Sequence, residues 1–151
     1  MKLTIHQGCD CVEPEIELRC RFLDHRLKKM TEYIRQYTIC LKGFSEKELY
    51  HIPLEQICYM EAVGKKTFLY LKDQVLESPE SLIRLEPLLF GTPVVRISKS
   101  CLINTDYLRS VRALVNHRME ATLTTGEKLI ISRTYIPSLL KKLEGSETSS
   151  H

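Results

Sequence analysis

The stretch VVRISKSCLINTDYL, Val94 to Leu108, decides the fold, because apolar groups at both ends enclose a polar and basic centre. The residues of that centre are Arg96, Ser98, Lys99 and Ser100. On a strand, the side chains at 96, 98 and 100 would share one face and Lys99 would lie on the other. Such donors suit phosphate oxygens and the acceptors on base edges, but a solvated sheet edge can carry the same pattern. The stretch alone leaves both interpretations open.

Length and composition describe an ordinary globular chain. Its 151 residues suit one domain, or a domain with a small extension. The hydrophobic fraction of 43% and the charged fraction of 27% are typical of a protein with one core. No apolar run approaches the roughly 20 residues of a membrane span, and residues 1–15 lack the apolar region of a signal peptide. We therefore expect a cytoplasmic protein that does not enter a membrane.

The distribution of charge is more informative than its total. The formal net charge of +3 is too small to indicate nucleic-acid binding by itself. Between Pro93 and Arg118, however, Asp106 is the only acidic residue among several basic ones. The basic residues are Arg96, Lys99, Arg109, Arg112 and Arg118. A local basic face is sufficient to attract phosphates even when the whole chain is nearly neutral.

The six cysteines are expected to be reduced thiols. Four of them have apolar neighbours and are expected in the core: Cys20, Cys40, Cys58 and Cys101. Cys9 and Cys11 instead flank Asp10 in a polar segment. Neither a second cysteine pair nor a histidine pair with the spacing of a zinc site accompanies them. We expect no metal site there, and a thiol redox sensor remains an alternative.

The N-terminal part of the chain has its own pattern. Residues 2–7 and 15–20 alternate between apolar and polar side chains, which predicts two short strands. Apolar residues at helical spacing from Leu23 to Tyr37 predict a helix over 22–36. Residues 1–42 are therefore expected to form a strand–strand–helix appendage, which is a candidate dimerisation element.

Most of the remaining chain has the pattern of short strands separated by turn residues, without the rhythm of a parallel sheet. Ser78 is expected to cap a helix, and Ser132 is expected to cap a last helix from Arg133 to Leu143. The pattern predicts a mainly β fold with a few short helices over residues 43–145, followed by a polar tail, 146–151. The strands are expected at 37–43, 49–52, 57–62, 67–72, 74–77, 108–115, 119–124 and 129–131.

Residues from about 46 to 143 resemble the LytTR family of bacterial DNA-binding domains. Three ordered segments carry the resemblance: PLEQICYMEA at 53–62 with the basic turn 64–66, VRISKSCLIN at 95–104, and ISRTYIPSL at 131–139. The middle segment is similar to the family motif Arg-x-His-[Arg/Asn/Lys]-Ser, an apolar triplet and Asn. This chain departs from that motif at Ser98, where the family usually has histidine.

The resemblance implies an elongated fold of stacked antiparallel sheets that inserts loop side chains into successive major grooves. Carried over by motif, the base-reading residues are Lys66 (or its neighbour Lys65), Lys99 and Arg133. Lysine and arginine can donate to the O6 and N7 atoms of guanine. The resemblance further implies residues that contact phosphates or stabilise the loops: Lys65, Arg96, Ser98, Ser100 and Thr134.

These expectations describe a sequence-specific transcription regulator that binds promoter repeats in double-stranded DNA as a homodimer. About 40 residues precede the LytTR-like region, which is far below the size of a receiver domain, so phosphotransfer within this chain is not expected. The sequence lacks the catalytic signatures of common enzyme classes, and we expect no enzyme activity, cofactor or small-molecule substrate. An RNA-binding or protein-interaction module remains the alternative class, although no stripe of aromatic residues for base stacking is evident.

Overall fold

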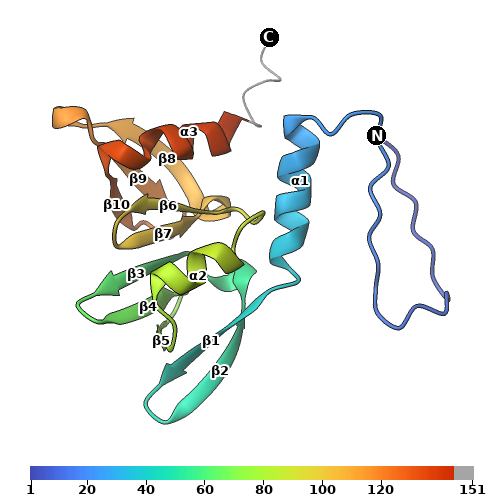
Figure 1. The fold of residues 1–151 in the computed structure, drawn as a ribbon, viewed down its shortest axis with the longest axis horizontal. Coiled ribbons are helices and arrows are strands. Elements are labelled where there is room, and N and C mark those ends of the chain that lie inside the picture. Colours follow the sequence, from blue (N-terminus) through green and yellow to red (C-terminus); the bar gives the residue numbers. More distant parts are fainter. Residues whose placement is uncertain (145–151) are drawn as a thin grey trace.

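A computed structural model of the chain describes residues 1–144, so the expected polar tail lies outside the described residues. Its largest element is a seven-stranded antiparallel sheet with the spatial order β2-β1-β5-β4-β3-β7-β6 (Figure 1). The strands of this first sheet are β1 Cys40–Ser45, β2 Glu48–Pro53, β3 Tyr59–Val63, β4 Lys66–Tyr70, β5 Val75–Ser78, β6 Val94–Ser98 and β7 Cys101–Asn104.

A second, three-stranded antiparallel sheet has the order β10-β9-β8. Three helices accompany the two sheets, and α3 lies against β6 (Figure 1). The remaining elements are β8 Leu108–Ala113, β9 Met119–Leu123, β10 Lys128–Ile131, α1 His25–Gln36, α2 Leu82–Leu88 and α3 Ile136–Leu143. The expected mainly β fold of stacked antiparallel sheets is confirmed.

Two hydrophobic cores lie on opposite faces of the first sheet. One core includes Leu85 of α2 and Leu102 of β7, and the other includes Ile103 of β7 and Leu123 of β9. Because successive side chains of a strand point to opposite faces, the neighbours Leu102 and Ile103 belong to different cores. All four residues of β7 are buried, which explains why the apolar triplet 101–103 does not alternate with polar residues.

The N-terminal segment differs from the expectation. The structure contains no strand before Cys40, so the two strands expected at 2–7 and 15–20 are absent. Residues 1–24 are exposed throughout. An isolated pair of strands is only marginally stable in water without an apolar surface to pack on. The first helix is present, and the Asp24 side chain caps it by accepting a hydrogen bond of 2.8 Å from the amide of Leu27.

Three smaller expectations also require correction. Cys20 and Cys40 are exposed, because Cys20 lies in the unpaired segment and Cys40 opens β1 on its polar face. The second helix starts after Ser81, because Ser78 still belongs to β5 and pairs with Thr67 of β4. A 3₁₀ turn, Arg133–Tyr135, precedes the last helix, and the Ser132 side chain makes no capping hydrogen bond.

Helix α1 is tied to the sheets by polar contacts from its C-terminal half. The buried Gln36 donates to the Asp106 carboxylate and accepts a hydrogen bond of 3.2 Å from the Asn104 amide. Glu32 forms an ion pair of 3.5 Å with Lys142 of α3. Both partners of that pair are less than one-fifth exposed. These contacts fix the helix against the end of β7 and against α3.

Within residues 1–144, no helix is long and apolar enough to cross a membrane.

Candidate nucleic-acid interface

Backbone pairing brings the three basic turns of the sequence to one end of the molecule. In the first sheet, Glu61 near the end of β3 lies opposite Cys101 at the start of β7. The Ala62 amide donates to the Ser100 carbonyl over 2.8 Å, which joins the β3–β4 and β6–β7 turns. The Ser132 amide donates to the Ile97 carbonyl over 2.8 Å, which places the end of β10 beside β6. Segments that are more than 30 residues apart in sequence therefore meet (Figure 1).

The cationic side chains on these turns face solvent. Lys65, Lys66, Lys99 and Arg133 are all exposed, and none of them forms an ion pair within the part of the chain that is described. Exposed cations without protein partners are available to phosphates and bases. Thr134 is also exposed beside Arg133.

The β3–β4 turn is a tight hairpin. Val63 pairs with Lys66, which leaves only Gly64 and Lys65 between the strands. Gly64 adopts φ +64°, a left-handed conformation that glycine accepts without strain. The register of a two-residue hairpin is fixed by its turn, so the two lysines project from a defined position at the end of the sheet.

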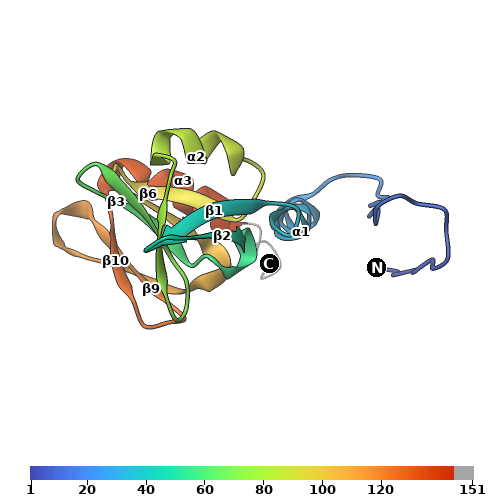
Figure 2. The same cartoon turned by 90° about the horizontal axis from the view of Figure 1, so that it is seen from below.

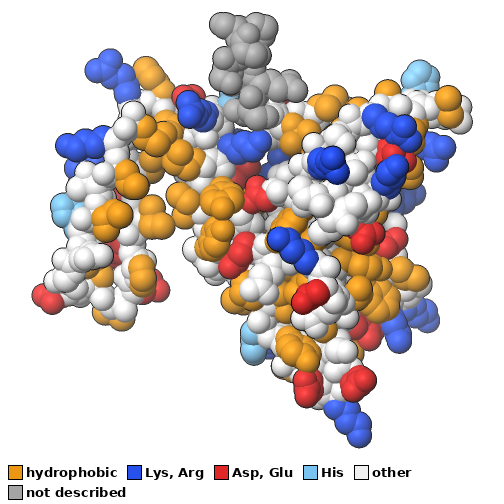
Figure 3. All heavy atoms as spheres, turned by 180° about the vertical axis from the view of Figure 1, so that it is seen from behind, with side chains coloured by type: hydrophobic (Ala, Val, Ile, Leu, Met, Phe, Trp, Pro, Cys, Tyr) orange, Lys and Arg blue, Asp and Glu red, His pale blue; other side chains and the backbone are white. Residues whose placement is uncertain are grey.

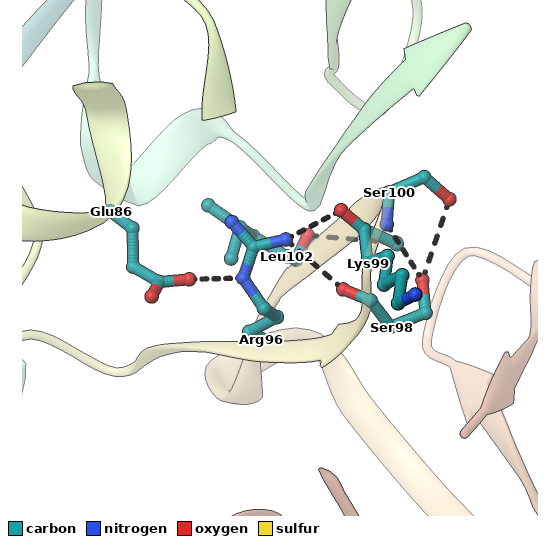
Figure 4. A network of polar contacts seen from close by, with 7 residues as sticks. Glu86, Arg96, Ser98, Lys99, Ser100 and Leu102 are labelled. Carbon is teal, nitrogen blue, oxygen red and sulfur yellow. Dashed lines mark hydrogen bonds and ion pairs between the residues drawn. The ribbon is translucent and has the colours of Figure 1, made fainter. Parts of the chain in front are cut away.

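Arg96 stabilises the β6–β7 turn by hydrogen bonds to its backbone (Figure 4). Its guanidinium donates to the carbonyls of Ser98 and Lys99, over 3.2 and 2.6 Å, and to the carboxylate of Glu86 on α2. The Arg96 side chain is only 16% exposed. Of the two roles expected for Arg96, this geometry supports loop stabilisation, because its donors are directed at the turn and at Glu86.

Ser98 also stabilises the turn. Its hydroxyl oxygen accepts a hydrogen bond of 3.3 Å from the Ser100 amide and lies 3.5 Å from the Ser100 hydroxyl (Figure 4). A β-bulge between Arg96 and Ser98 shifts the register of β6 against β7 at this point. A short side chain that hydrogen-bonds two residues ahead is typical of a serine turn, so serine fits this position although the family usually has histidine.

His117 is a candidate that the sequence did not indicate. It lines a shallow hollow of about 400 Å³ together with Arg133, Ile136 and Pro137. Asn116 and His117 have φ values of 64° and 59°, so the loop between β8 and β9 bends sharply beside Arg133. The β9–β10 hairpin brings His117 beside Arg133, because Met119 pairs with Ile131 and the two residues lie just beyond that pair on their respective strands.

The remaining basic residues of the stretch 93–118 do not all join this surface. Arg112 is paired with Glu120 over 2.9 Å, and Arg109 lies in a groove beside Leu140 of α3. The basic surface is therefore smaller than the sequence stretch suggested.

The two N-terminal cysteines lie together in the exposed segment. The sulfur atoms of Cys9 and Cys11 are 2.6 Å apart. A hydrogen bond from Cys11 lowers the pKa of the Cys9 thiol, and the same contact raises the pKa of Cys11. Among the residues described, no group of three or more histidine, cysteine or acidic side chains is arranged to hold a metal ion.

Comparison with known proteins identifies the family. The family model of the LytTr DNA-binding domain matches residues 47–144, which include all three basic turns. The chain belongs to the LytTR family. The middle motif therefore belongs to a LytTR domain, in which the turn of residues 98–101 is one of three neighbouring basic turns.

Two similar proteins agree with the LytTR assignment. The sensory transduction protein LytT of Enterococcus faecalis (strain ATCC 700802 / V583) is 22% identical over 98 residues, which are 65% of this chain and 40% of that protein. This chain thus spans less than half the length of that relative. The structure of the LytTr DNA-binding domain of a methyl-accepting/DNA response regulator from Bacillus cereus shares the fold, with a TM-score of 0.65 at 20% identity. That likeness covers 69% of this chain and 95% of the other.

Proposed function

We propose that this protein is a sequence-specific transcription regulator that acts in the bacterial cytoplasm, where it binds repeated half-sites in promoter DNA as a homodimer. The observation that carries the proposal is the convergence of three exposed basic turns at one end of a LytTR domain. A row of cations without acidic partners is suited to the phosphates of a duplex, and turns are narrow enough to enter its major groove.

We assign base reading to Lys66, Lys99 and Arg133. Each side chain is exposed at a turn, and each can donate to guanine O6 and N7. Lys65, Ser100 and Thr134 would contact phosphates from neighbouring positions. Arg96 and Ser98 would hold the middle turn in place, as their contacts with the turn backbone support.

The proposal is tested by selecting duplexes from a random-sequence pool with the full-length protein and measuring affinity for the selected duplex at several salt concentrations. Affinity should fall steeply with salt, with a logarithmic slope of roughly −0.9 per phosphate neutralised. It should greatly exceed the affinity for a scrambled duplex of the same composition. A flat salt response, or equal affinity for the two duplexes, would contradict sequence-specific recognition.

Single substitutions then separate base reading from phosphate contact. Arg133→Ala should reduce the preference for the selected over the scrambled duplex by about 1–3 kcal/mol, with little change in salt slope. Lys65→Ala should weaken binding to both duplexes equally. It should also reduce the salt slope by about the amount that one phosphate contact contributes. Lys47→Ala is the matched control, because this exposed lysine lies in the β1–β2 turn, separated from β3 by two other strands. Binding of the corresponding RNA duplex with equal affinity would favour an RNA-binding module instead.

A further inference from the structure

Residues 1–24, here called the N-terminal arm, form a segment with the pattern of strands but without a strand partner. The arm runs out beyond α1 and returns to it, and it contacts nothing in the body for most of its length (Figures 1 and 2). In Figure 3 it stands apart at the left of the view, with hydrophobic side chains along it. Among these side chains, Leu3, Ile5 and Ile16 are 73–86% exposed.

The sequence of the arm from Glu15 to Arg21 is self-complementary. It reads EIELRCR, with acidic residues at 15 and 17, basic residues at 19 and 21, and apolar residues between them. If two copies of this segment pair antiparallel with Leu18 opposite Leu18 of the second copy, Glu15 lies opposite Arg21 and Glu17 lies opposite Arg19. Opposite charges directly across an antiparallel pair are stabilising, whereas like charges are destabilising.

The same register also aligns the apolar face. Ile16 lies opposite Cys20 of the second copy, and the two Leu18 side chains meet at the twofold axis, all on one face of the paired strands. The single chain already shows that the charged residues share a face, because Arg19 and Glu17 contact each other over 3.2 Å. The side chains of Arg19 and Glu17 are 85% and 72% exposed, so each of them can pair with a residue of a second copy instead.

We propose that two copies of this chain associate through antiparallel pairing of residues 15–21 about a twofold axis at Leu18. The alternating segment 2–7 then adds an outer strand on each side, which gives four strands. Two strands alone are marginal in water, whereas three or more with an apolar face are stable. The absence of strands from the arm of one chain is what this arrangement predicts. The inference specifies the dimer contact of the proposed function, but the association itself does not require DNA.

Charge exchange tests the pairing without DNA, by sedimentation of the full chain. Wild type should sediment at twice its 17.6 kDa mass. The acidic-arm variant, Arg19→Glu with Arg21→Glu, and the basic-arm variant, Glu15→Arg with Glu17→Arg, should each be monomeric. An equimolar mixture of the two variants should restore a dimer of one copy of each. The variant with all four substitutions, which reverses the charge order, should again form a homodimer.

Each contrary result overturns the inference. A monomeric wild type excludes the dimer, and dimeric single-sign variants show that another surface carries it. Monomers that do not associate on mixing exclude this register. Because the arm is exposed, the body of each variant should keep its circular dichroism spectrum.

A cross-link tests the axis directly. With Cys9, Cys11, Cys20 and Cys40 replaced by serine, Leu18→Cys should form a disulfide-linked dimer on mild oxidation, whereas Val12→Cys, equally in the arm, should not. Equal cross-linking at both positions would indicate random collision. The proposed DNA contacts involve other residues, so loss of DNA binding with an intact dimer, or the reverse, distinguishes the two proposals.

Discussion

Arg96 connects three parts of the chain, since its guanidinium contacts the carboxylate of Glu86 and two carbonyls of the β6–β7 turn. Lysine cannot reproduce these contacts, because an ammonium group lacks the planar fork of guanidinium. We expect Arg96→Lys to reduce affinity for the selected duplex about tenfold, equal to about 1.4 kcal/mol. Thermal unfolding should change by only a few degrees, because the turn lies outside both cores.

Arg112→Lys is the control for this prediction. Arg112 also pairs with a glutamate, but its side chain is 67% exposed and holds no turn. Equal losses of affinity in the two variants would show that replacing a paired surface arginine weakens DNA binding wherever it lies. That result would contradict a specific role for Arg96.

The cysteines should differ in reactivity because their environments differ. The pKa of Cys9 is lowered by the Cys11 thiol, whereas burial raises the pKa of Cys58 and raises that of Cys101 to about 12. The thiolate is the reactive form, so at neutral pH iodoacetamide should modify Cys9 before the exposed Cys20. Peptide mass spectrometry after brief alkylation measures this order.

Cys11→Ser tests whether the Cys11 thiol causes the reactivity of Cys9, since this substitution should reduce the difference in alkylation rate between Cys9 and Cys20. A redox sensor additionally requires oxidation to alter DNA affinity. If oxidised and reduced protein bind the selected duplex equally well, that alternative is lost.

At the scale of elements, α1 depends on a buried side chain. Gln36 is 1% exposed and is hydrogen-bonded to Asn104 and Asp106. Gln36→Met keeps the volume but removes both contacts and leaves the Asn104 amide group with fewer partners. We expect a loss of about 1–3 kcal/mol in the free energy of unfolding. Urea denaturation measures it, and Arg26→Ala, on the exposed side of α1, should have little effect.

The sequence predicted some elements correctly and others wrongly. Most strands between residues 40 and 131 could be predicted, because alternation or an apolar run bounded by turn residues marks them. β6 and β7 were not assigned as strands, because the polar and basic centre of the stretch 94–108 also suits a loop. The arm has the same alternation, but the pattern does not state whether a partner strand is present. The choice between the two roles expected for Arg96 could not be made from the sequence, since it depends on the contact with Glu86 of a different element.

The three basic turns were predicted through the family motifs, and their proximity followed from the strand order and from the hydrogen bond of Ser132 to Ile97, which places the end of β10 beside β6. β3 and β7 are neighbours although about 40 residues separate them in sequence, because β4, β5 and β6 occupy other places in the sheet. His117 belongs to none of the family motifs, and its position beside Arg133 follows from the register of the β9–β10 hairpin, in which Met119 pairs with Ile131.

At the scale of the whole molecule, a dimer with a docked α1 should hold its two LytTR domains at a defined separation. The contacts of Gln36 and Glu32 restrict movement of α1 against the sheets. Inserting about half a helical turn, roughly 5 base pairs, between selected half-sites should therefore weaken binding more than inserting a full turn of about 10. Gel-shift affinities for the two spacings measure this. Equal affinities would indicate a flexible connection between the domains.

The position of β7 between two cores has a further consequence for how this domain can acquire new DNA targets. Leu102 and Ile103 anchor the strand from opposite faces, while Lys99 and Ser100 immediately before it are exposed. Substitutions at these exposed positions leave the apolar packing unchanged. Under the proposed base-reading role of Lys99, a single substitution there changes the preferred DNA sequence while the domain stays folded, so a new target sequence can be acquired without loss of stability.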